Sequence, residues 1–136
     1  MQLDSKSPEE TQKIAEKLIQ AYPDHKVWLL EGDLAAGKTH LVKGLAKALA
    51  LSSSVHSPTF AYLNEYEGAL AHYDLYRLES EDQELLQLLN EHFEAGIYVA
   101  IEWPSRMEFP LIKSHLQIKI SHEGGDHRSF EITPLP

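Results

Sequence analysis

The sequence predicts an α/β fold in three layers, with a mostly parallel central sheet, antiparallel edge strands and helices on both faces. Short apolar runs, of the kind found in strands buried on both faces, alternate with stretches whose apolar residues recur at helical spacing. This alternation indicates a parallel core. The last two strand-like segments flank Gly124-Gly125, which is typical of a hairpin and predicts the antiparallel edge. A chain of 136 residues suits one domain, which we expect to span residues 1–136.

Signals at helix ends and helical periodicity predict three helices. Ser7 is suited to cap the first helix and Pro8 to open it, and Pro23 ends it after Tyr22. The second helix follows the glycine-bearing loop and is amphipathic. Four leucines are expected on the buried side of the third: Leu85, Leu86, Leu88 and Leu89. We therefore expect helices over residues 8–22, 38–50 and 80–92.

Apolar runs and alternating segments bounded by turn residues predict the strands. The run Val27–Leu30 is apolar throughout, as expected of a central strand. Gly68 separates the second strand from the third, and Gly96 precedes the fourth. We expect strands over residues 27–30, 59–66, 69–74, 97–101, 116–120 and 129–132.

Composition narrows the functional classes. A net charge of −9 disfavours autonomous binding to nucleic acid, for which a basic surface normally supplies most of the affinity. The absence of cysteine excludes disulfides and thiol chemistry. No apolar run approaches the ~20 residues of a membrane span, and the first residues lack a signal-peptide pattern. We expect a cytoplasmic protein, without membrane contact, that acts on a small molecule or with a partner.

The segment Gly32–Thr39 satisfies the phosphate-loop pattern G-x(4)-G-K-[ST]. It joins a buried strand to an amphipathic helix, so that backbone amides and the helix dipole converge on an anion. Lys38 is suited to contact the β- and γ-phosphates, and the Thr39 hydroxyl to ligate Mg²⁺. The fold is thus predicted to be the P-loop NTPase sandwich, with ATP and Mg²⁺ as ligands. The expected nucleotide-binding residues are Asp33, Leu34, Ala35, Ala36, Gly37, Lys38, Thr39 and His40.

Two acids stand at the ends of predicted strands, Asp74 and Glu102. In an open α/β sheet the site lies outside the carboxyl ends of the parallel strands. If both strands run parallel to residues 27–30, both acids face the loop and are candidates for Mg²⁺ binding and hydrolysis. The alternative for each is a solvated acid at a strand end. Taken by itself, Trp103 is more typical of a packing residue than of a functional one. Residues 57–60 fit two interpretations equally well: a switch-like segment with a hydroxyl near the γ-phosphate, or a turn that precedes a strand.

Four motifs taken together resemble the TsaE family, formerly YjeE, of P-loop ATPases in tRNA threonylcarbamoyladenosine biosynthesis. They are E-G-D-L-A-A-G-K-T at residues 31–39, S-P-T-F at 57–60, H-Y-D-L-Y-R at 72–77 and I-E-W-P at 101–104. The resemblance implies ATP binding and hydrolysis together with the TsaD and TsaB proteins, with tRNA reached only through that complex. It also implies roles for several residues: Lys38 on phosphate; Thr39, Asp74 and Glu102 at Mg²⁺; and Asp74, Glu102, Trp103 and the switch-like Thr59 in catalysis.

The chain departs from the family pattern at two positions of the loop. Ala35 stands where the family usually has glycine, and alanine adds strain on the order of 1 kcal/mol if the backbone there requires positive φ. His40 stands where a second hydroxyl residue is usual, so that only its backbone amide is left to donate to the α-phosphate. Both changes bear on the affinity for nucleotide.

Two alternatives remain open from the sequence. A small-molecule kinase shares the phosphate loop but needs an acceptor pocket and an arginine-bearing lid, for which the residues after Glu102 offer little length. A nucleotide-gated interaction module with negligible hydrolysis fits the acidic charge. Phosphate release without an added acceptor distinguishes the first alternative, and stimulation of that release by partners distinguishes the second.

Overall fold

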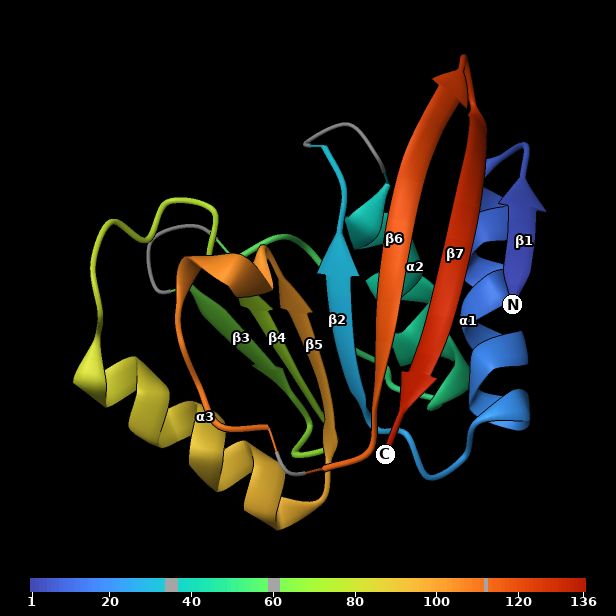
Figure 1. Cartoon of the computed structure of the whole chain (residues 1–136). Coiled ribbons are helices and arrows are strands. Elements are labelled where there is room, and N and C mark those ends of the chain that lie inside the picture. Colours follow the sequence, from blue (N-terminus) through green and yellow to red (C-terminus); the bar gives the residue numbers. More distant parts are fainter. Residues whose placement is uncertain (34–36, 59–61, 112) are drawn as a thin grey trace.

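The computed structural model describes residues 1–33, 37–58, 62–111 and 113–136 and has an α/β fold built on one seven-stranded sheet (Figure 1). The strand order is β1-β7-β6-β2-β5-β4-β3. Strands β6, β2, β5 and β4 run parallel to one another, whereas β3 is antiparallel to β4, β7 to β6 and β1 to β7. The prediction of a parallel centre with antiparallel strands toward the edges is confirmed.

The four central strands carry the apolar runs. Their bounds are Val27–Glu31 for β2, Leu70–Asp74 for β4, Tyr98–Glu102 for β5 and His115–Gly124 for β6. The outer strands are Gln2–Ser5 for β1, Leu63–Tyr66 for β3 and His127–Leu135 for β7. Every residue of β5 is buried, because both of its faces are covered.

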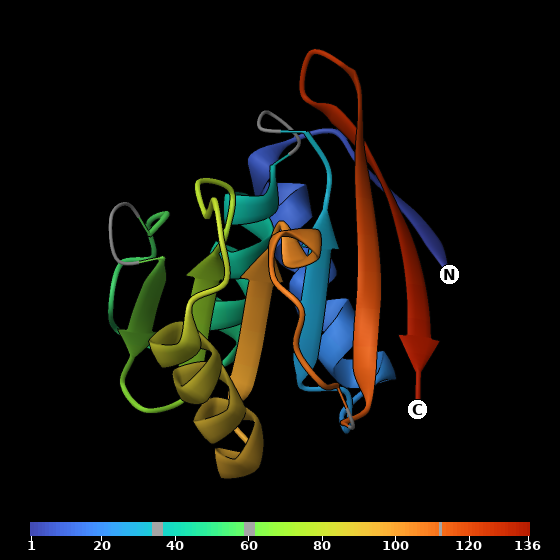
Figure 2. The same ribbon diagram turned by 60° about the vertical axis from the view of Figure 1, so that its left-hand side comes forward.

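Helices cover both faces of the sheet (Figure 2). The helices α1 (Pro8–Ala21) and α2 (Lys38–Ala48) pack on one face, where Trp28, Leu30 and Phe130 belong to the core. The helix α3 (Gln83–Ala95) packs on the other face against residues such as Tyr73. A Cβ on Gly44 of α2 would lie 2.4 Å from the carbonyl oxygen of Gln12 in α1, so this glycine permits the close approach of the two helices.

Several predicted bounds are wrong. The third helix begins at Gln83 and ends at Ala95, because the Asp82 side chain caps the Leu85 amide and Gly96 ends the helix in the left-handed conformation. Leu88 is 39% exposed and does not face the core. The terminal hairpin is longer than predicted on both strands, and β1 was not predicted. The strand expected from residue 59 begins at Leu63, and residues 59–61 lie outside the described residues.

No helix within the described ranges is both long enough and apolar enough to cross a membrane.

Candidate functional site

The carboxyl ends of the parallel strands meet at one edge of the sheet, the upper edge in Figure 1. The chain leaves β2 at Glu31 and returns as α2 at Lys38. Asp74 ends β4 and Glu102 ends β5, so both strands deliver an acid to this edge. The condition set from the sequence, that these strands run parallel to β2, is met, and the site lies where open α/β sheets bind ligands.

The start of α2 presents backbone amides to this edge. Gly37 is the N-cap residue and has φ of 95°, a left-handed conformation that favours glycine. The Leu41 amide donates to the Gly37 carbonyl, which leaves the amides of Lys38, Thr39 and His40 without a partner inside the helix. Such amides, with the helix dipole, suit an anion. The expected contacts of Leu34, Ala35 and Ala36 lie outside the described residues.

Lys38 is buried, with 3% of its surface exposed, although it carries the charge expected to bind phosphate. Its Nζ donates to the Gly32 carbonyl at 2.5 Å and lies 4.1 Å from the centre of the Trp103 ring. Burial lowers the pKa of the ammonium, and the carboxylates of Glu102, Asp74 and Asp33 oppose that shift. Asp33, itself exposed, is therefore close enough to act on Lys38.

Asp74 and Glu102 are side-by-side partners in the register of β4 and β5. Burial raises the pKa of Asp74, and the neighbouring Glu102 raises it further, whereas a hydrogen bond from the Tyr76 amide to Oδ1 at 3.0 Å lowers it. Glu102 is buried, and its Oε2 is 2.5 Å from Nε2 of His72. The structure thus brings together two carboxylates and one lysine.

Replacing Asp74 with asparagine is expected to raise the free energy of unfolding at pH 7 in the absence of nucleotide. The folded pKa of Asp74 lies above its unfolded value of about 3.9, so its contribution to stability is fully present below that pH and is lost as pH rises through the folded pKa. The gain from Asp74→Asn should therefore be absent near pH 3.5 and grow as pH rises above it. Denaturant unfolding of Asp74→Asn and of the unmodified chain, at several pH values between 3.5 and 7, measures this difference in the free energy of unfolding.

The matched control is Asp126→Asn, in the exposed turn between β6 and β7. Because this side chain is exposed, its replacement should change the free energy of unfolding at pH 7 by less than Asp74→Asn does. Parallel pH profiles for Asp74→Asn and the unmodified chain would contradict the burial argument.

Trp103 is fixed by its backbone as well as by its ring. It has φ of 59° and ψ of 52°, a left-handed conformation that is unusual for a bulky residue and recurs at functional sites. Its amide donates to the Leu30 carbonyl at 3.3 Å, and the Leu75 amide donates to the Glu102 carbonyl at 3.1 Å. These bonds tie the ends of β2, β4 and β5 together, so the ring is held over Lys38.

Thr39 lies in the first turn of α2, and its hydroxyl oxygen is 2.8 Å from that of Ser57. The segment after α2 therefore reaches the residue expected to ligate Mg²⁺. Two serines at the beginning of this segment, Ser52 and Ser53, donate backbone and hydroxyl hydrogen bonds to the Glu67 carboxylate. The expected role of Thr59 lies outside the described residues.

The residues at this edge fit a magnesium ion. Asp74 and Glu102 lie side by side on neighbouring strands, so a divalent cation between them would relieve the repulsion of their charges. Thr39 adds a hydroxyl oxygen close to Lys38 in the chain. Nucleotide sites commonly hold Mg²⁺ by one or two carboxylates together with the phosphates, and this edge offers two carboxylates.

His72 was not among the predicted site residues, although it holds Glu102. It is fully buried, and its Nδ1 has no hydrogen-bond partner among the described residues. A signal in the sequence was present: His72 and Asp74 are two apart in a strand and so share one face. The Tyr76 ring packs edge-on against Trp103, with ring centroids 4.9 Å apart. No sequence pattern predicts this contact, because it joins two separate loops.

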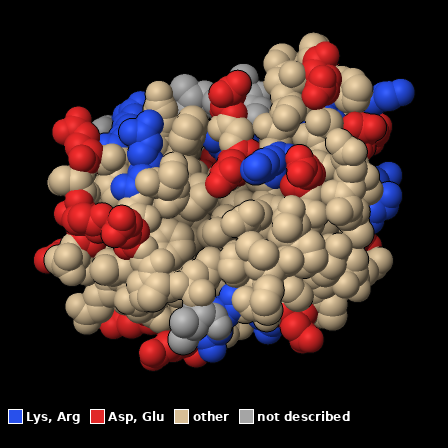
Figure 3. Space-filling view, viewed as in Figure 1, with Lys and Arg blue, Asp and Glu red and all other residues tan. Residues whose placement is uncertain are grey.

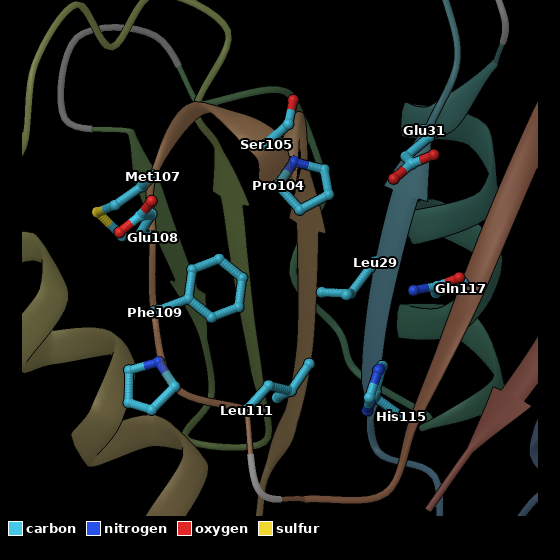
Figure 4. A pocket seen from close by; sticks show the side chains of 11 residues that line it. Leu29, Glu31, Pro104, Ser105, Met107, Glu108, Phe109, Leu111, His115 and Gln117 are labelled. Carbon is cyan, nitrogen blue, oxygen red and sulfur yellow. The ribbon is translucent and has the colours of Figure 1, made fainter.

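A groove of about 770 Å³ opens beside the site, on the face that carries α3 (Figure 4). Leu29 and Leu111 project into it, Phe109 and Met107 line one wall, and Glu31 lies at the end nearest the loop. Figure 3 shows the centre of this face hollowed and largely uncharged, with charged side chains around it. The turn that carries Trp103 contributes Pro104 and Ser105 to the lining.

These features define an α/β protein with a lysine-bearing glycine loop at the carboxyl edge of parallel strands, the arrangement of nucleotide-binding proteins. The chain belongs to the TsaE family: the family model "Threonylcarbamoyl adenosine biosynthesis protein TsaE" matches residues 5–130. The resemblance inferred from the four motifs is confirmed.

Two relatives and one solved structure illustrate the match. The tRNA threonylcarbamoyladenosine biosynthesis protein TsaE of Bacillus subtilis is 38% identical over 132 residues, which cover 95% of this chain and 82% of the relative. The protein of the same name from a Nostoc species is 45% identical over 117 residues, which cover 80% and 70%. The crystal structure of YdiB from Bacillus subtilis superposes with a TM-score of 0.73 at 32% identity, covering 100% of this chain and 86% of that one.

Proposed function

We propose that this chain is a P-loop ATPase of the three-layer sandwich type, one domain over residues 1–136, that serves tRNA threonylcarbamoyladenosine biosynthesis. The observation that carries the proposal is the position of Lys38, whose ammonium lies at the start of α2 among the carboxylates of Asp74 and Glu102. A phosphate loop for ATP and acids for Mg²⁺ and water thus converge on one edge of the sheet. Family membership supports the pathway.

Each residue at this edge has a role in hydrolysis. The amides at the start of α2 and the Lys38 ammonium bind the phosphate oxygens, where negative charge is concentrated. Thr39, with Asp74 or Glu102, would hold a Mg²⁺ ion, which would supply positive charge to the phosphates. Glu102 is the residue suited to orient the attacking water and accept its proton, because His72 fixes one carboxylate oxygen at 2.5 Å.

The partners proposed from the family are the TsaD and TsaB proteins, with tRNA contacted through them in the cytoplasm. The net charge of −9 supports this indirect contact, because a polyanion repels an acidic protein unless a basic partner intervenes. The contact between the Lys38 ammonium and the Trp103 ring supports low intrinsic turnover, since the ring competes with phosphate for the ammonium.

The test is phosphate release from Mg-ATP by the purified chain, alone and with cognate TsaB, TsaD and tRNA. Low release alone and a rise of about tenfold or more with the partners is expected, the factor that corresponds to 1.4 kcal/mol. A rate of phosphate release that is unchanged by the partners but rises when a small acceptor molecule is added would identify a kinase. Nucleotide binding with no release under either condition would identify an interaction module.

A further inference from the structure

Arg106 lies on the short turn that carries Trp103. This 3-10 helix, η1 (Pro104–Arg106), follows β5 directly. Pro104 and Met107 on either side of Arg106 are buried, which fixes the turn, whereas Arg106 itself is exposed. The position of the Arg106 backbone is therefore set by the core, and its side chain is free to project from the surface.

The guanidinium group of Arg106 rests on the two aromatic rings that border the site. Its Cζ lies 5.4 Å from the centre of the Tyr76 ring and 5.7 Å from that of Trp103. The ammonium of Lys38 lies 4.1 Å from the same Trp103 ring. Two cations thus contact one aromatic side chain, which places Arg106 near the phosphate-binding lysine.

Arg106 carries no competing ion pair within residues 1–33, 37–58, 62–111 and 113–136, where no carboxylate lies within 4.0 Å of its guanidinium. An arginine held only by exposed ring contacts is weakly held. It can turn toward a phosphate without breaking a salt bridge. The planar guanidinium binds phosphate oxygens with two parallel hydrogen bonds, which an ammonium cannot do.

The charges at the site favour a second cation. The carboxylates of Glu102, Asp74 and Asp33 all act on Lys38, so acidic side chains surround the phosphate-binding lysine before any nucleotide arrives. A nucleoside triphosphate adds further negative charge, and a bound divalent cation offsets only part of it. Trp103 precedes the turn that carries Arg106 and contacts the Lys38 ammonium, the group suited to bind the terminal phosphate.

We propose that Arg106 binds the terminal phosphate of the bound nucleoside triphosphate and thereby distinguishes a triphosphate from a diphosphate. The inference rests on the proposed function, because it assumes that the loop at residues 32–39 holds the phosphates. It adds a specificity-determining residue that the phosphate-loop pattern does not contain. Arg106 leaves its aromatic contacts when the triphosphate enters and returns to them when only the diphosphate remains.

The experiment measures, by calorimetry, binding of Mg²⁺ with a non-hydrolysable ATP analogue and of Mg-ADP to the full chain. Arg106→Ala should lower the affinity for the triphosphate about tenfold and the affinity for the diphosphate less than about twofold, because a charge-assisted contact is lost for the triphosphate alone. Arg106→Lys keeps the charge without the paired hydrogen bonds and should give an intermediate loss. Lys17→Ala removes an exposed charge from α1 and should change neither affinity.

If Arg106→Ala lost affinity equally for both nucleotides, or lost none for the triphosphate, the proposed role of Arg106 would be overturned. In either case binding by the unmodified chain that depends on Lys38 would leave the proposed function standing. If neither the unmodified chain nor Lys17→Ala bound any nucleotide, the proposed function itself would fail, and this inference with it. The three variants should unfold at the same temperature as the unmodified chain, since both altered side chains are exposed.

Discussion

Replacing Lys38 with alanine is expected to abolish ATP binding, with an affinity at least about 100-fold lower than that of the unmodified chain. The Lys38 ammonium is buried at the start of α2, where it is suited to contact the phosphates. Its removal takes away the ammonium that lies among the carboxylates of Asp74 and Glu102, which then repel the phosphates more strongly. Calorimetric titration with Mg-ATP measures the effect.

Lys47→Ala is the matched control, because Lys47 is an exposed lysine of the same helix, nine residues or about 14 Å along the axis from Lys38. It should bind ATP as the unmodified chain does. Circular dichroism should show that Lys38→Ala remains folded, since alanine favours helices and the variant removes a charge whose burial is unfavourable. Undiminished binding by folded Lys38→Ala would remove the phosphate loop from the site.

The parts of the fold that the sequence predicted are those with local signals. The first helix was placed within one residue because Ser7 caps it and Pro8 opens it. The strand β1 has one apolar residue, Leu3, and forms because β7 offers a free edge for antiparallel pairing. No local pattern in Gln2–Ser5 carries that information. The extension of the hairpin to Gly124 and His127 is likewise a matter of pairing between two strands.

The same distinction applies to the site. Lys38, Thr39, Asp74 and Glu102 were predicted, because a loop pattern and the carboxyl ends of strands are readable in one dimension. The contact of Lys38 with the Trp103 ring and the bond of His72 to Glu102 join β4, β5 and α2 in space. Such contacts are fixed by strand order, which places β5 between β2 and β4. The sequence alone does not specify that order.

The difference between binding and turnover is expected to appear most clearly at Glu102. Glu102→Gln should leave the affinity for Mg-ATP within about threefold and lower the rate of phosphate release at least about 100-fold. Glutamine keeps the volume of the side chain and an oxygen able to accept a hydrogen bond from His72, so the buried contact between β4 and β5 survives. It lacks the negative charge and the basicity needed to accept a proton from water.

Calorimetry and phosphate release, measured on the same preparation with and without the partner proteins, separate the two quantities. Glu94→Gln, an exposed substitution of the same type on α3, should change neither. If Glu102→Gln hydrolysed ATP at the rate of the unmodified chain, Glu102 would be a structural partner of His72 and Asp74 would become the candidate base. If binding were lost together with turnover, Glu102 would act chiefly on the bound Mg²⁺, because loss of a metal ligand lowers affinity for the metal-bound nucleotide before it affects chemistry. Selective loss of turnover is the result that places the proton acceptor at the end of β5, beside the ring that holds Lys38.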